Sequence, residues 1–301
     1  MKILYFDCFS VMSGDMVIGA LLDAGADADV LVEELSKVDL ADEYEITWKK
    51  VNKQGITSTK FDVMLKNDEQ LEVHHHNHRD SQHGHHDNHH KHQHRNHVRQ
   101  HDHEEHYAHA DQHAHHDHDH AHNGHHHHNH AHHRTYRHIV ELIQNAALTD
   151  NVKTIAINIF TKIAKAEGRI HGVPMEDVHF HEVGAVDSII DIVGTAILID
   201  QLKVDRIISS PIPVGSGKIR IDHGIYPVPA PATLEILRGI PLAASNIKGE
   251  LTTPTGAAIA SVLSKEFGPM PSMTVDTIGY GAGTKDIPNH PNVLRVVIGQ
   301  K

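Results

Sequence analysis

Histidine dominates one internal stretch of this chain and divides the remainder into two parts. Residues 74–133 hold 29 histidines in 60 positions, and Val98, Tyr107 and a few alanines are their main apolar side chains. Such a stretch cannot bury enough apolar surface to offset the entropy lost on folding. We therefore expect a disordered insertion over 73–134, between folded sequence over 1–72 and 135–301.

The composition of this histidine tract predicts metal binding. Neutral imidazole is the commonest protein ligand for divalent nickel, copper and zinc. The candidate ligands are the consecutive residues His125, His126, His127 and His128. The alternative is a polar insert whose histidines bind metal in vitro without a cellular role. Protons compete with metal for these nitrogens at about pH 6, because imidazole ordinarily titrates near that pH.

The overall composition argues against several classes of protein. The formal net charge is −12, the basic residues are scattered and aromatic residues make up 4%, so we expect no nucleic-acid surface. No apolar run approaches the roughly 18 residues of a membrane-spanning helix, and the N-terminal apolar run is too short for a signal peptide. Cys8 is the single cysteine, which excludes an intramolecular disulfide. We expect a cytoplasmic protein in which Cys8 is a small buried side chain.

Outside the tract, strands alternate with helices, which predicts an α/β or α+β fold with a mixed sheet and packed helices. Strands are expected over 2–6, 44–50, 59–65, 206–209, 218–222 and 292–298. Helices are expected over 15–24, 28–38, 136–147, 152–168, 187–202, 230–238 and 256–266. Gly168 is expected to end the fourth helix. We expect 135–301 to complete the folded unit that 1–72 begins.

A short HFHE sequence carries the sharpest site prediction outside the tract. If it is extended, side chains two positions apart share a face, so His179 and His181 point the same way. Glu182 is adjacent, and Asp187 and Asp191 lie one turn apart in the helix that follows. Together they resemble the donor set of a divalent metal site. The alternative is a surface strand with incidental histidines, followed by a helix that Asp187 caps.

The turn between the first strand and the first helix is a second candidate site. Backbone N–H groups at a helix start can receive an anion, which makes Ser13, Gly14 and Asp15 candidates for cofactor binding. Asp7 ends the strand and is expected to hold a cation or a hydroxyl of a bound nucleotide. The alternative is an ordinary strand-to-helix turn with Ser13 as the helix cap.

Several motifs together resemble the LarC family of nickel insertion proteins. They are YFDCFS followed by SGDM, VHFHEVGAVDSIIDIVG, PIPVGSG, HGIYPVPAPATLEIL, ELTTPTGAA, GYGAGTKD and PNVLRV, with a histidine-rich insert after the first. The resemblance runs over essentially the whole chain apart from the tract. Because several of these motifs are long and unusual, chance similarity does not account for them.

The resemblance implies a cyclometallase, a lyase of the chelatase type, that inserts nickel(II) into pyridinium-3,5-bisthiocarboxylic acid mononucleotide. One carbon–nickel and two sulfur–nickel bonds form, giving the pincer cofactor of lactate racemase and related enzymes, so apo lactate racemase is an expected partner. The family's reaction is accompanied by CTP hydrolysis with Mg²⁺ or Mn²⁺. A base must take the ring proton as the carbon–nickel bond forms, and His179, His181 and Glu182 are the candidates, with Asp187 beside them.

The resemblance also implies a further C-terminal domain. Family members continue into a domain to which CTP binding is assigned, whereas this sequence stops at Lys301. We expect that domain to be absent here and to be supplied in trans or through a frameshift. Turnover by this chain alone is left open, as is assembly into a homo-oligomer. The alternative function is non-catalytic storage and delivery of nickel or zinc.

Overall fold

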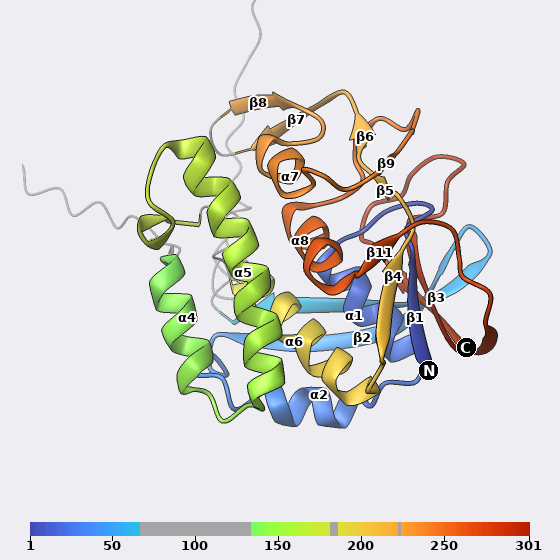
Figure 1. Ribbon diagram of the computed structural model, residues 1–301, viewed down its shortest axis with the longest axis horizontal. Coiled ribbons are helices and arrows are strands. Elements are labelled where there is room, and N and C mark those ends of the chain that lie inside the picture. Colours follow the sequence, from blue (N-terminus) through green and yellow to red (C-terminus); the bar gives the residue numbers. More distant parts are fainter. Residues whose placement is uncertain (67–133, 181–185, 222–223) are drawn as a thin grey trace, which may run out of the picture. The chain divides into compact units, whose positions relative to one another are not determined.

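The computed structural model describes residues 1–66, 134–180, 186–221 and 224–301 (Figure 1). The described residues belong to one compact unit that draws on both sides of the histidine tract. The boundary expected at residue 72 lies outside the described residues, as do the tract ligands His125, His126, His127 and His128.

A mixed sheet of seven strands forms the centre of this unit, in the order β11-β4-β1-β13-β12-β3-β2. β1 is parallel to β4 and antiparallel to β13, so the first long strand of the chain pairs with the last. The strands are β1 Lys2–Asp7, β2 Tyr44–Lys53, β3 Ile56–Leu65, β4 Arg206–Ser209, β11 Glu266–Phe267, β12 Thr274–Ala282 and β13 Val293–Gln300. The predicted fold class, with its mixed sheet, is confirmed.

Helices pack against one face of the sheet (Figure 1). Leu4 and Phe6 of β1 enter the main core with the helices, while Ile3 and Tyr5 enter a small cluster on the opposite face. The helices are α1 Gly14–Asp23, α2 Ala28–Leu35, α4 Tyr136–Asn145, α5 Asp150–His171, α6 Val186–Leu202, α7 Pro231–Ile236 and α8 Pro254–Leu263, with a 3-10 turn at Met175–Asp177.

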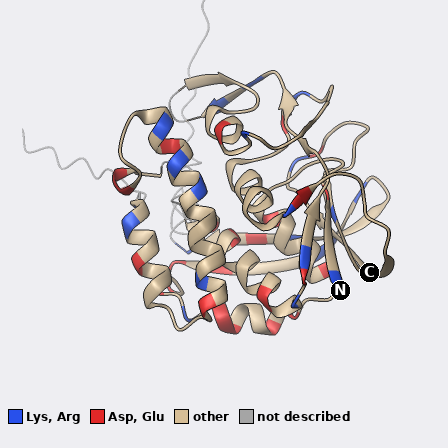
Figure 2. Cartoon of the chain, viewed as in Figure 1, with Lys and Arg blue, Asp and Glu red and all other residues tan. Residues whose placement is uncertain are grey.

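Three pairs of short strands lie outside the main sheet. They are β5 Ile212–Pro213 with β9 Leu242–Ala243, β6 Gly215–Ser216 with β10 Gly249–Glu250, and β7 Lys218–Ile221 with β8 Gly224–Pro227. Acidic and basic residues are interspersed over the described elements (Figure 2). Within the described ranges, no helix is both long enough and apolar enough to cross a lipid bilayer.

Helix α1 lies with its backbone directly against the sheet because glycines leave room for it. A Cβ at Gly281 of β12 would lie 1.8 Å from the carbonyl oxygen of Met16, and one at Gly279 would lie 2.1 Å from that of Ala20. On the helix itself, a Cβ at Gly19 would lie 2.4 Å from the carbonyl oxygen of Thr59. The glycines of the GYG sequence therefore serve helix–sheet packing.

Some details of the sequence prediction are wrong. Helix α8 does not reach residue 266 but ends at Leu263, and Glu266 begins strand β11. Helix α5 does not end at Gly168 but continues to His171, and Gly172 ends it in the left-handed conformation with φ 68°. A Cβ at Gly168 would lie 2.8 Å from the carbonyl oxygen of Val173, so this glycine makes room for the returning chain. Strand β12 was not expected, because glycine inside a strand weakens the local pattern. Backbone pairing with β13 stabilises this strand although its local sequence has a weak strand pattern.

Both described ends that flank the tract contact the same residue, Glu43. The backbone N–H of Lys66 donates to the carbonyl oxygen of Glu43 at 3.1 Å. Nη2 of Arg134 donates to the two carboxylate oxygens of Glu43 at 2.6 and 2.7 Å. Residues 66 and 134 are therefore held beside one another by the folded unit.

We expect Gly281→Ala to destabilise the fold, because the added methyl group would overlap the Met16 carbonyl oxygen. Overpacking of this kind costs about 1–3 kcal/mol, measured as a lower midpoint of urea unfolding. Gly268→Ala is the matched control, since no described atom lies within 4 Å of its added Cβ. Equal midpoints for the two variants would contradict the direct contact of α1 with β12.

Candidate functional site

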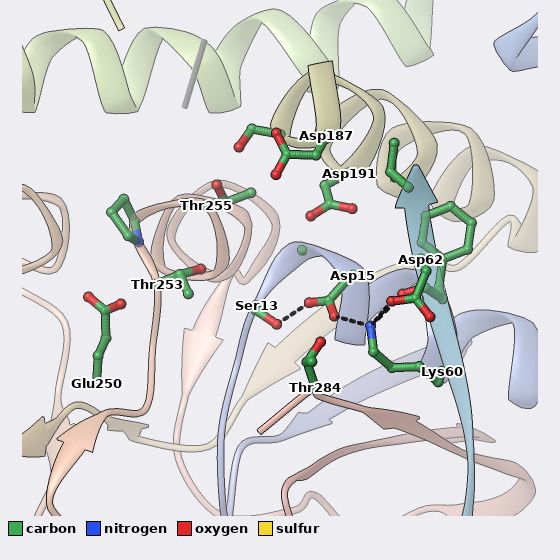
Figure 3. A pocket seen from close by; sticks show the side chains of 15 residues that line it. Ser13, Asp15, Lys60, Asp62, Asp187, Asp191, Glu250, Thr253, Thr255 and Thr284 are labelled. Atoms are coloured by element: carbon green, nitrogen blue, oxygen red, sulfur yellow. Dashed lines mark hydrogen bonds and ion pairs between the residues drawn. The ribbon is translucent and has the colours of Figure 1, made fainter. Parts of the chain in front are cut away.

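A cavity of about 340 Å³ opens where helices α1, α6 and α8 begin (Figure 3). Five of its lining side chains are carboxylic acids and one is a lysine. The polar lining residues are Ser13, Asp15, Lys60, Asp62, Asp187, Ser188, Asp191, Glu250, Thr253, Thr255 and Thr284. We call this the acidic cavity.

Backbone hydrogen bonds fix the loop that leads into α1. The N–H of Met12 donates to the carbonyl oxygen of Leu251 at 2.9 Å, and the N–H of Thr253 donates to that of Met12 at 3.2 Å. The Thr253 hydroxyl caps α8 by accepting from the N–H of Gly256 at 3.1 Å. A Cβ at Gly256 would lie 2.3 Å from the Met12 carbonyl oxygen. The starts of α1 and α8 are thus locked together at the cavity.

Lys60 reaches the acidic cavity from β3 and pairs with two carboxylates. Its side chain is 9% exposed, and Nζ lies 3.0 Å from Oδ2 of Asp15 and 2.6 Å from Oδ1 of Asp62. The hydroxyl of Ser13 donates to the other oxygen of Asp15. Burial by itself lowers the pKa of Lys60, but the two carboxylates together raise that pKa above its ordinary value. Lys60 therefore keeps its positive charge in the cavity.

Asp191 is a buried carboxyl group with little compensation. Its Oδ1 is buried and has no hydrogen-bond partner among the described residues. Burial, and then the charges of Asp15 and Asp187, raise the pKa of Asp191 well above its ordinary range, while Lys60 and the backbone N–H of Asp15 act in the opposite direction. A Cβ at Gly14 would lie 2.6 Å from the Asp191 side chain, so only glycine allows this approach.

Asp187 lies in the first turn of α6 and lines the same cavity. Burial raises its pKa, and hydrogen bonds from the backbone N–H groups of Ser188 and of Asp187 itself lower it in part. The structure therefore brings Asp187 together with Ser13, Gly14 and Asp15, which the sequence assigned to a separate cofactor site.

His179 lies on the surface, between the buried side chains of Val178 and Phe180. It forms a β-bridge with Thr135, which agrees with the extended conformation expected at this position. His181 and Glu182 lie outside the described residues, and the shared face of the two histidines stays a prediction. Among the described residues, no group of three or more His, Cys, Asp or Glu side chains is arranged to hold a metal ion.

Asp7 lines a second cavity, of about 390 Å³, at the other end of the loop between β1 and α1. Nε of Arg295 donates to Oδ2 of Asp7 at 2.8 Å, and Nη2 donates to the same oxygen. Asp7 therefore does not join the candidates Ser13, Gly14 and Asp15. The neighbouring Cys8 is buried, as expected, and burial raises the pKa of its thiol to about 12.

Sequence reasoning missed the part of the acidic cavity that comes from outside α1 and α6. Lys60 and Asp62 lie on one face of β3, Glu250 comes from β10, and Thr284 comes from the loop after β12. A usable signal was present only for β3, where two opposite charges stand two positions apart in a strand. β10 and the loop after β12 are positioned by backbone hydrogen bonds to distant parts of the chain, which no local sequence pattern predicts.

We expect Asp191→Asn to be more stable than the wild type at pH 7. The folded state raises the pKa of Asp191 above its unfolded value of about 3.9. Below that unfolded pKa the wild type has its full free energy of unfolding, because the Asp191 carboxyl group is neutral. This contribution is lost as the pH rises through the folded pKa. Urea unfolding between pH 4 and 8 should therefore show the advantage shrinking toward pH 4. Asp276→Asn, at an exposed position, is the control. An advantage that does not change with pH would contradict this origin.

Comparison with known proteins places the chain in one family. A family model described as nickel insertion protein matches residues 4–301. A pyridinium-3,5-bisthiocarboxylic acid mononucleotide nickel insertion protein from Geobacillus kaustophilus is 46% identical over 301 residues, covering all of this chain and 60% of the relative. Proteins of the same name from Clostridium kluyveri and Clostridium acetobutylicum are 44% and 47% identical, again over the whole chain and over 63% and 64% of the relatives.

This chain thus spans about three-fifths of the length of these relatives. No solved structure matches it. The family model covers nearly every residue, and the identity to each of the three relatives exceeds 40%. The chain therefore belongs to the family of nickel insertion proteins.

Proposed function

We propose that this chain inserts nickel(II) into pyridinium-3,5-bisthiocarboxylic acid mononucleotide, the compound in the names of its relatives. The observation that carries the proposal is the acidic cavity at the start of α6. Asp187 lines it, and the HFHE sequence lies three residues before the helix that bears Asp187. The predicted donors His179, His181 and Glu182 precede Asp187 by five to eight positions in the sequence.

The donors of this proposal suit a metal that must be passed on. Nickel(II) accepts nitrogen and oxygen ligands, and imidazole and carboxylate groups exchange more readily than a closed thiolate cage. The excess of carboxylates around Lys60 attracts a divalent cation, which is the cargo here. The two thiocarboxylate sulfurs of the mononucleotide then replace the protein donors as nickel ligands.

Formation of the carbon–nickel bond requires an acceptor for one ring proton. The electron pair of the ring C–H bond becomes the bond to nickel, and the proton passes to a base within hydrogen-bonding reach. His179, His181 and Glu182 remain the candidates for this base, with Asp187 beside them. CTP hydrolysis with Mg²⁺ or Mn²⁺, and transfer of the finished cofactor to apo lactate racemase, belong to the proposal through the family resemblance.

Storage and delivery of nickel or zinc is the second candidate function, supported by the 29 histidines of the tract. The two functions differ in which part of the chain they need. Insertion depends on the HFHE sequence and the acidic cavity, whereas storage depends on the tract alone.

We expect a variant with residues 74–133 replaced by a short Gly-Ser linker to keep cofactor formation at saturating nickel. Lys66 and Arg134 both contact Glu43, so the linker has little distance to span. At limiting nickel its rate should fall below that of the wild type, because the reservoir is gone. The assay follows activation of apo lactate racemase with CTP and Mg²⁺, and the remaining two-fifths of a full-length relative is added in trans.

We expect the double variant His179→Ala, His181→Ala to lose cofactor formation by about 100-fold or more at saturating nickel, the usual effect of removing a general base. His138→Ala, at an exposed position of α4, is the matched control and should retain activity. Full activity of the double variant would exclude His179 and His181 as the base and as required nickel donors. Loss of nickel binding in the tract-less variant without loss of insertion would confine storage to the tract.

A further inference from the structure

The second cavity lies beyond the carboxyl ends of two parallel strands. Asp7 ends β1, Ser210 follows β4, and both residues line the cavity. β1 is parallel to β4 but antiparallel to β13 on its other side, so the strand direction changes at β1. In open α/β sheets, ligands bind in the crevice outside the carboxyl ends of parallel strands.

Arg295 holds the carboxylate of Asp7 by one oxygen and leaves the other open. Both Nε and Nη2 of Arg295 donate to Oδ2, and Oδ1 accepts no hydrogen bond from any described residue. The side chain of Asp7 is 13% exposed. A fixed carboxylate with one open oxygen is the group with which dinucleotide-binding folds accept a ribose hydroxyl. Because a carboxylate oxygen only accepts hydrogen bonds, it pairs with a hydroxyl group and not with the oxygens of a phosphate dianion.

His290 brings a second unsatisfied polar atom to this cavity. It lines the cavity, and its Nε2 is buried without a hydrogen-bond partner in the described part of the chain. A turn fixes the residue, since its N–H donates to the carbonyl oxygen of Ile287 at 3.2 Å. The buried hydroxyl of Ser10 donates to the carbonyl oxygen of Pro291 at 2.5 Å and ties this turn to the loop after β1. A hydroxyl group satisfies Nε2 in either protonation state, because it both donates and accepts.

Phe9 gives the cavity a flat apolar surface. Its side chain is 41% exposed, and the guanidinium carbon of Arg295 lies 5.6 Å from the ring centroid. Pro211, Ile247 and Leu251 add apolar wall around the few polar groups. Mostly apolar lining with a few convergent polar groups is typical of a small-molecule site, and planar bases stack on exposed aromatic rings.

We propose that this second cavity binds the nucleoside part of a ribonucleotide. Asp7 Oδ1 accepts from one ribose hydroxyl, Nε2 of His290 pairs with a neighbouring hydroxyl, and the planar ring lies against Phe9. The link to nickel insertion rests on the proposed function, in which the compound that receives nickel is a mononucleotide. The binding site itself rests on the open oxygen, the unpartnered imidazole nitrogen and the cavity.

Calorimetric titration of the full chain without nickel tests the site directly, with nicotinic acid mononucleotide as the pyridinium ribonucleotide probe. We expect binding by the wild type, and no binding of nicotinic acid, which lacks the ribose. His290→Ala and Phe9→Leu should each weaken binding by about tenfold, and Asp7→Asn by more. His138→Ala and Asp276→Asn, both exposed, are the matched controls. Urea unfolding shows which variants are folded, and if Asp7→Asn is not, the other two decide.

Wild-type affinity in both His290→Ala and Phe9→Leu would overturn the inference, as would equal binding of inorganic phosphate or of the 2′,3′-dideoxyribose analogue. Failure of this inference is distinguishable from failure of the proposed function. If cofactor formation proceeds while both His290→Ala and Phe9→Leu bind the probe normally, only the site is wrong. If the probe binds as expected and the complete assay forms no cofactor, only the function is wrong.

Discussion

The two backbone hydrogen bonds that join Met12 to Leu251 and Thr253 fix the position of the loop between β1 and α1. Because the loop is held through its backbone, its side chains remain available at both ends. Ser13 to Asp15 line the acidic cavity, and Asp7 to Ser10 line the second cavity. Gly256 is part of the same constraint, since any side chain there would force α8 away from the Met12 carbonyl oxygen. A small movement of α8 would therefore alter both cavities together.

The acidic cavity contains the positive charge of Lys60 together with several carboxyl groups. For some of these groups, burial makes the ionised form unfavourable. Lys60 satisfies Asp15 and Asp62, which leaves Asp191 and Asp187 with raised pKa values and, in Asp191, an unpartnered oxygen. A cation entering the cavity would lower those pKa values and release protons. The acidic cavity therefore favours the binding of a cation over that of an anion. In the second cavity, the charge of Asp7 is balanced by that of Arg295.

Local patterns in the sequence were enough for most elements and for part of the acidic cavity. Strand β1, helix α1 and helix α6 follow from short-range periodicity, and Asp187 was recognised because it opens a helix after HFHE. The features that the sequence did not predict depend on contacts with residues far away in the chain. Strand β12 is defined by its pairing with β13, Gly168 by the chain returning at Val173, and the separation of Asp7 from Asp15 by the Met12 bonds to Leu251 and Thr253. The paired face of His179 and His181 stays a prediction.

Glu43 accepts hydrogen bonds from Lys66 and Arg134, the described residues on either side of the tract. The fold therefore holds the described residues on both sides of the tract at a single residue of the folded unit. For a flexible segment, each doubling of length costs only about 0.6 kcal/mol of closure entropy. Histidines can thus be gained or lost in evolution without a compensating change elsewhere in the folded unit. The histidine content of the tract and the geometry of the two cavities are therefore open to independent selection.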